Sequence, residues 1–150
     1  MKVFVNRKYV DGPWGGGNQF VKNLFEYGKK FGVEVTNRLS DDLDVIHIQD
    51  VHADDVGVDY VAAVRYKQEI NPKVKIVHRV NDADLGRDVK FREDAYKELS
   101  KYTYATIFVS DWTKNYFINK GWYCDNTFVL YNGIDTEIFK PREPLNDGKI

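Results

Sequence analysis

The chain of 150 residues contains one cysteine, Cys124, and no apolar run of the length that spans a bilayer. A single cysteine excludes an internal disulfide framework and a cysteine-rich zinc site. Residues 1–10 hold no apolar stretch long enough for a secretory signal, and a membrane-spanning helix needs about 20 apolar residues. These absences predict a cytoplasmic protein without a transmembrane segment, and they leave peripheral contact with the inner face of the membrane open.

The chain also lacks an excess of charge of either sign. Its 22 Lys and Arg residues face 23 Asp and Glu residues, which gives a formal net charge of -1. Nucleic-acid-binding proteins carry a basic patch or stripe, whereas the basic residues here are scattered along the sequence. We therefore expect no nucleic-acid partner, and any anion site must be local. With 43% hydrophobic and 30% charged residues, the composition is that of one globular domain with a single core.

Strand and helix patterns alternate along the sequence. Six short apolar or β-branched runs predict strands, namely Val3–Val5, Val33–Thr36, Asp44–Ile48, Lys75–Val80, Thr106–Val109 and Thr127–Tyr131. Four segments of helical period predict helices, at residues 20–31, Asp59–Ile70, Phe91–Tyr102 and Ser110–Gly121. This order predicts an α/β fold: a Rossmann-like, doubly wound, mostly parallel sheet with helices on both faces.

The expected helices carry signals for their faces and their ends. Gly32 is expected to end the first helix, because glycine readily adopts the left-handed backbone conformation found at helix C-termini. Pro72 is expected to end the second, because the residue before a proline avoids helical backbone angles. Ser110 is predicted to cap the fourth helix rather than to act as a nucleophile, since no G-x-S-x-G elbow is present. In the first helix, four apolar residues at helical spacing are expected to face the sheet: Phe20, Leu24, Tyr27 and Phe31.

A glycine-rich loop follows the first strand and leads into the first helix. Gly15, Gly16 and Gly17 let an anionic group approach the backbone, and the helix start adds unpaired N–H groups and the positive end of the dipole. A phosphate-bearing ligand and a merely tight turn both explain this pattern. It is no P-loop, because no Gly-Lys-Ser/Thr follows, and Phe20 stands where the dinucleotide fingerprint has its third glycine. An NAD-dependent dehydrogenase is therefore disfavoured.

Polar residues also follow the fourth strand. Strand alternation puts Arg79 and Asn81 on the same side of the strand. There the guanidinium of Arg79 and the amide of Asn81 can point together at a sugar or a phosphate. The carboxylates of Asp82 and Asp84 come next and could hydrogen-bond a sugar hydroxyl. The alternative is an ion pair between Arg79 and one of these aspartates that only ties the loop.

The loop after the third strand offers a second place for an acceptor, at Asp50 and His52. A metal site is an alternative interpretation. However, His47 and His52 are separated by an odd number of positions, so strand alternation would point them in opposite directions. We therefore expect no metal and a core position for His47. Trp112, after the fifth strand, is a candidate stacking platform for a sugar or a base.

Four segments resemble the N-terminal, acceptor-side domain of a GT-B fold glycosyltransferase of the family 4 type, and the resemblance spans essentially the whole chain. They are residues 15–19 (GGGNQ), residues 75–82 (KIVHRVND), residues 106–112 (TIFVSDW) with Lys114, and residues 129–135 (VLYNGID) with Phe139 and Pro141. The last segment resembles the hinge that leads into the donor domain and is the most specific of the four.

The resemblance implies two Rossmann-like domains facing across a cleft, with a nucleotide-sugar donor held mostly by the C-terminal domain and a sugar or lipid-linked acceptor mostly by the N-terminal one. It implies retention of anomeric configuration without a required divalent metal or other cofactor. Matching positions put Gly16 and Gly17 near the donor diphosphate, and Asn81, where many relatives have a histidine, near the transferring sugar. Together with the loop residues considered above, this gives three predicted sets. The donor-phosphate set is Gly15, Gly16, Gly17 and Asn18; the catalytic pair is Asn81 and Asp82; the acceptor set is Arg79, Asp50, His52, Asp84 and Trp112.

The resemblance also sets the expected domain organisation. Residues 1–139 are expected to form the Rossmann-like domain and residues 140–150 an interdomain linker, with the C-terminal donor domain absent from the sequence. Such a chain is expected to be inactive alone, because half a cleft excludes water poorly. The alternative from another functional class is a stand-alone nucleotide- or carbohydrate-binding module.

Overall fold

The computed structural model of the protein describes residues 1–12, 14–52, 55–82, 90–122, 125–136 and 139–141. Its strands are β1 (Lys2–Val5), β2 (Glu34–Thr36), β3 (Val45–Ile48), β4 (Lys75–Val80), β5 (Ala105–Phe108) and β6 (Thr127–Val129). Its helices are α1 (Gly15–Gly28), the 3-10 turn η1 (Lys29–Phe31), α2 (Tyr60–Glu69), α3 (Lys90–Ser100) and α4 (Asp111–Asn119). Each strand predicted from the sequence is present, within two residues at either end.

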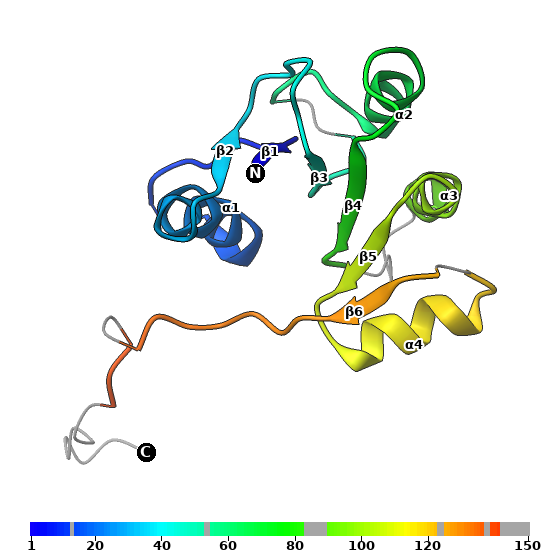
Figure 1. Ribbon diagram of the computed structural model, residues 1–150. Helices are drawn as coiled ribbons and strands as arrows, with labels where there is room; N and C mark the ends of the chain where they lie inside the picture. The colour runs from blue at the N-terminus through cyan, green and yellow to red at the C-terminus, as the bar shows by residue number, and fades with distance from the viewer. Residues whose placement is uncertain (13, 53–54, 83–89, 123–124, 137–138, 142–150) are drawn as a thin grey trace.

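The six strands form one sheet in the order β2-β1-β3-β4-β5-β6, and every neighbouring pair is parallel. Helix α1 lies on one face of the sheet, and α2, α3 and α4 lie on the other (Figure 1). The Rossmann-like, doubly wound α/β fold is therefore confirmed. The strand order reverses between β1 and β3, and in open α/β sheets this is where ligands bind beyond the carboxyl ends of the strands.

The two faces of the sheet are buried to different extents. In β4, Ile76, His78 and Val80 are buried against the side of α2 to α4, whereas Val77 on the opposite side is only half-buried. Helix α3 continues this core with Ala95 and Leu99. The hydrophobic core thus lies mainly between the sheet and α2 to α4, which leaves the α1 side open enough for a cavity.

Helix α1 shows a different buried face from the predicted one. Val21 is fully buried, whereas Tyr27 and Phe31 are 41% and 80% exposed, so the prediction that the latter two face the sheet is wrong. Gly28 explains the difference: a Cβ on it would lie 2.8 Å from Cγ2 of Val35 in β2. The helix end approaches the sheet through a glycine, and this rotates the aromatic side chains outward.

Gly28→Val is expected to lower the free energy of unfolding by about 1–3 kcal/mol, the usual cost of forcing extra atoms into a packed contact. The added side chain has no room, because the backbone oxygen of Val33 also lies 3.2 Å from the Cβ position. Urea unfolding measures the effect. Gly133→Val is the control, since a Cβ there meets no atom within 4 Å. Equal stability of the two variants would contradict the packing argument.

Three predicted helix ends are confirmed. Gly32 has a left-handed φ of 69° after η1, where its N–H bonds to the carbonyl of Lys29. Asp59 caps α2 by accepting a hydrogen bond from the N–H of Ala62 at 2.8 Å. The hydroxyl of Ser110 caps α4 by accepting one from the N–H of Thr113 at 3.1 Å. The hydroxyl of Ser110 is thereby used structurally.

Candidate functional site

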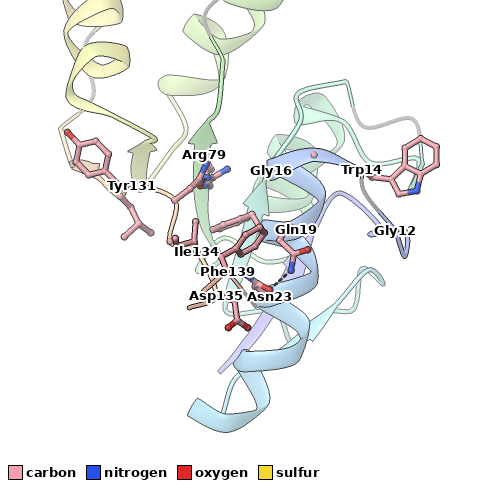
Figure 2. A pocket seen from close by; sticks show the side chains of 15 residues that line it. Gly12, Trp14, Gly16, Gln19, Asn23, Arg79, Tyr131, Ile134, Asp135 and Phe139 are labelled. Carbon is pink, nitrogen blue, oxygen red and sulfur yellow. Dashed lines mark hydrogen bonds between the residues drawn. The ribbon is translucent and has the colours of Figure 1, made fainter. Parts of the chain in front are cut away.

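A cavity of about 740 Å³ lies at the carboxyl edge of the sheet. One wall comes from the glycine loop and the first half of α1, and the other from residues 130–135 and Phe139, which follow β6 (Figure 2). Arg79, at the end of β4, lies at the inner end of this cavity, whereas Asp135 lies toward the opposite end. A volume in this range accommodates a small-molecule ligand.

The glycine loop is held by backbone geometry and by one amide side chain. Gly12 and Gly15 have positive φ values of 114° and 76°, which L side chains rarely adopt. Asn18, predicted to contact a donor phosphate, instead donates to the carbonyl of Val10 at 2.8 Å and accepts from its N–H at 2.7 Å. Asn18 is buried and does not line the cavity. The structure therefore shows it securing the loop.

Helix α1 begins at the cavity without a side-chain cap. The first-turn N–H groups of a helix have no acceptor within the helix, and among the described residues no side chain of the N-cap position accepts from them here. Gly15 and Gly16 line the cavity, and a Cβ on Gly17 would lie 3.6 Å from both Nε2 of Gln49 and Nη1 of Arg7. The predicted glycines thus sit at an exposed helix start with cationic and amide donors nearby.

Asn6, which the sequence analysis did not single out, joins the ends of β1 and β3. Its side chain is fully buried, accepts from the N–H of Gln49 at 2.7 Å and donates to the carbonyls of Asp50 and Val58. Each polar atom of the amide is therefore satisfied. This asparagine fixes the loop that carries Asp50 at the strand-order reversal, and its position directly after an apolar strand is the one sequence signal for it.

Arg79 is the buried cation of the site. Its side chain is only 2% exposed, and its guanidinium stacks on the ring of Phe20 at 3.8 Å. One Nη donates to Oδ1 of Asn81, as the shared side of the strand predicts, and the other to Oδ1 of Asn132 at 2.5 Å. Burial lowers the pKa of Arg79 to about 10, so the side chain is still a cation at neutral pH. No ion pair among the described residues includes Arg79, so the Arg79–Asp82 alternative is not observed. The Arg79–Asp84 alternative concerns a residue outside the described ones.

His47 and Gln49 lie beside Arg79. The ring of His47 contacts Phe20, with centroids 5.7 Å apart, and its Nε2 lies 3.3 Å from Oε1 of Gln49. Burial lowers the pKa of His47 to about 4 despite the Gln49 hydrogen bond, and the charge of Arg79 lowers it further. A neutral His47 matches the predicted core position. In the part of the chain that the structure describes, no group of three or more His, Cys, Asp or Glu side chains is arranged to hold a metal ion.

The other predicted site residues lie outside the cavity lining. Asp50 and His52 are half-buried in the loop after β3, where the Asp50 carboxylate accepts from the N–H of His52 at 3.0 Å. Asp82 is exposed just beyond β4. Trp112 is 57% exposed and stacks on Tyr116 of α4. Asp84 and Cys124 lie outside the described residues, as does the predicted linker apart from residues 140–141.

A parallel sheet of this order, with a ligand-sized cavity beyond its carboxyl ends, has the architecture of a Rossmann-like domain. A model of the family described as Glycosyltransferase Family 4 matches residues 36–138, and the chain belongs to this family. The matched segment contains β3 to β6 and most of the cavity wall after β6, but it begins after the glycine loop. None of the curated proteins compared with the chain matches it significantly.

Family membership makes the chain a glycosyltransferase-type domain, for which sugars are the expected substrates. Among the described residues, no helix has the length and apolar composition to cross a membrane.

Proposed function

We propose that the chain is the acceptor-binding half of a retaining glycosyltransferase that uses a nucleotide-sugar donor. The observation that carries this proposal is the family match, which covers the strands β3 to β6 with Arg79 and most of the cavity wall that follows β6. In this role the start of α1 contributes N–H donors to the donor diphosphate through Gly15, Gly16 and Gly17. A leaving diphosphate gains charge as the glycosidic bond breaks, and preorganised N–H groups stabilise such charge.

In the same proposal, Arg79 binds the acceptor and Asn81 lies near the transferring sugar. Asn81 is oriented for this task because it accepts from Arg79 and its Nδ2 lies 3.4 Å from the carbonyl of Gln49. Asp82 orients an acceptor hydroxyl from the next position of the loop. Residues 130–135 and Phe139 form one wall of the cavity, so movement of a following donor domain would change the shape of the site.

A transfer assay tests the proposed function. The chain alone, and the chain combined with a family 4 donor domain, are incubated with labelled nucleotide-sugars and a panel of sugar and lipid-linked acceptors. We expect transfer with retained anomeric configuration only in the combination, since the donor half of the cleft is supplied there. Turnover by the chain alone above the no-enzyme control would contradict the proposal that this chain supplies only half of the active site. Nucleotide-sugar binding without transfer in the combination would instead indicate a stand-alone binding module.

Asn81→Ala and Asp82→Ala are expected to reduce turnover of the combined enzyme about tenfold or more, with little change in melting temperature. A tenfold loss corresponds to about 1.4 kcal/mol of transition-state stabilisation. The matched controls are Asn115→Ala and Asp94→Ala, which remove the same groups at exposed positions of α4 and α3. Full turnover in both site variants, or activity lost only in step with stability, would make the loop after β4 structural.

A further inference from the structure

The last strand of the sheet has an open edge. Among the described strands β6 pairs with β5 alone, and it lies at the end of the sheet (Figure 1). The N–H of Leu130 donates to the carbonyl of Phe108 in β5 at 2.9 Å. Because the backbone groups of a strand alternate between its two sides, the N–H and C=O groups of Thr127 and Val129 point away from β5. They form an outward row of donors and acceptors, which can pair with another strand.

The side chains along this edge are uncharged. Residues 126–134 contain no Asp, Glu, Lys, Arg or Pro. Phe128, in the middle of β6, aligns with Ile107 of β5 and through it with Arg79 of β4, so it lies on the cavity side of the sheet. Its side chain is 57% exposed. An aromatic and β-branched strand with an open edge and no charge is of the kind that pairs with another chain.

The opposite edge of the sheet is protected by charge. Its strand β2 begins with Glu34, whose side chain is 67% exposed and lies 3.7 Å from Nζ of Lys2. Arg38, two residues beyond β2, is exposed as well. Charged side chains are one of the means by which edge strands avoid pairing with another chain. The contrast makes β6 the edge that is suited to such pairing.

We propose that β6 pairs in antiparallel orientation with β6 of a second copy of this chain, which joins the two sheets into one. The outward row fits a second copy because it is symmetric about Phe128, with Thr127 and Val129 one residue to either side. A two-fold axis at Phe128 bonds Thr127 of each copy to Val129 of the other. The two Phe128 residues then form a pair without mutual backbone hydrogen bonds, whose Cα atoms are about 4.5 Å apart.

This arrangement has two physical consequences. Aromatic side chains that face each other across neighbouring strands stabilise the pairing, and here they cover each other's exposed rings. Pairing about a two-fold axis uses the same edge of both copies, so the assembly closes at a dimer. The inference goes beyond the proposed function and does not depend on it.

Helix α4 adds surface beside the strand. The hydroxyl of Tyr131 donates to the carboxylate of Asp111 at 2.5 Å, which ties the chain after β6 to the start of α4. Tyr116 lies toward α3, where it donates to Glu93 at 2.8 Å. Ile118 is about 200° further around the helix and is 45% exposed. Stable interfaces bury at least about 1,200 Å², more than a pair of short strands provides, so we expect α4 to contribute and the dimer to dissociate on dilution.

Sedimentation velocity of the chain over a range of concentrations tests the dimer. We expect a monomer–dimer equilibrium. Phe128→Lys places like charges opposite each other at the centre of the pair and should raise the dissociation constant about tenfold or more. Because Phe128 is exposed, this variant should keep its melting temperature. Phe31→Lys is the matched control, since it makes the same change at an 80% exposed position outside β6, and it should dimerise like the unsubstituted chain.

Hydrogen exchange and cross-linking locate the contact without relying on Phe128→Lys. The amides of Thr127 and Val129 should become protected only as the dimer forms, whereas the amide of Leu130, which donates to β5, is protected in the monomer as well. Phe128→Cys, combined with Cys124→Ser, should link two copies by a disulfide on oxidation, because position 128 lies opposite itself. Thr127→Cys in the same background should link them less, because position 127 lies opposite Val129.

Several results would overturn the inference. A chain that stays monomeric at every concentration forms no such pair. A dimer that Phe128→Lys leaves unchanged, or that Phe31→Lys weakens equally, uses another surface. The same holds for a dimer in which the amide of Val129 stays unprotected. Equal cross-linking by Phe128→Cys and Thr127→Cys would contradict the antiparallel register, and growth beyond two copies would contradict the two-fold symmetry.

Discussion

Acidification from pH 7 to pH 5 is expected to lower the free energy of unfolding by about 4 kcal/mol, because two buried histidines must stay neutral in the fold. Burial lowers the pKa of His78 to about 3 and that of His47 to about 4, from an ordinary 6.5. The unfolded chain therefore binds protons that the folded chain excludes. Stability is full above pH 6.5 and falls as the pH drops toward the folded pKa values. Small domains are stable by only about 5–15 kcal/mol, so the effect is large.

Urea unfolding at pH 7, 6 and 5 measures this loss, and His78→Leu identifies its source. Neither ring nitrogen of His78 has a hydrogen-bond partner among the described residues, and the ring packs on Tyr96 with centroids 4.9 Å apart. The variant should therefore be nearly as stable at pH 7 and should lose about half of the pH dependence. Glu93, whose pKa is lowered by Lys120 and Tyr116 despite burial, acts below this window. If the free energy of unfolding of His78→Leu changed with pH as much as that of the unsubstituted chain, His78 would not be a source of the loss.

Phe117→Ala is expected to destabilise the domain by about 3–5 kcal/mol, the usual cost of emptying a core aromatic position. Phe117 of α4 is fully buried. Its ring stacks on Trp122 at 4.2 Å and contacts Tyr96 and Phe108, with centroids 6.0 and 6.1 Å away. These contacts join α3, α4 and β5, so no single neighbour can move to fill the space.

Phe31→Ala is the matched control, because it removes the same side chain at a position that is 80% exposed. A surface substitution of this kind usually changes stability by less than about 0.5 kcal/mol. Thermal and urea unfolding of both variants measure the difference. Comparable melting temperatures for Phe117→Ala and Phe31→Ala would show that the aromatic cluster contributes little to stability.

Local sequence signals predicted most elements of the fold. Short β-branched runs such as Lys75–Val80 match the observed strands closely, because a strand buried on both sides needs apolar residues throughout. Helix ends at Asp59 and Ser110 were also predictable, since a capping side chain acts on its own helix within three residues. Periodicity failed in α1, where Tyr27 and Phe31 point outward because Gly28 lets the helix end approach Val35.

The candidate site was predictable only in part. Arg79, Asn81 and the glycines were found because they follow strands whose carboxyl ends share one edge of the sheet. Asn132 was named within the hinge segment, yet its hydrogen bond to Arg79 joins positions 53 residues apart. Gln49 was also passed over, because an amide after a strand has no distinctive spacing. Its importance comes from burial and from the neighbours that the fold brings to it.

The sequence by itself determined the α/β class, the parallel sheet, the helix caps and the resemblance to family 4 glycosyltransferases, because periodicity, capping and short motifs act over a few residues. Only the tertiary structure decided which residues enclose the cavity, that Asn18 secures the loop, and that Arg79 is buried between Phe20 and Asn132. These outcomes depend on contacts between distant segments, whose geometry follows from how the helices pack on the sheet. The burial and the contacts of Arg79, rather than its residue type alone, make this strand-end arginine part of the candidate site.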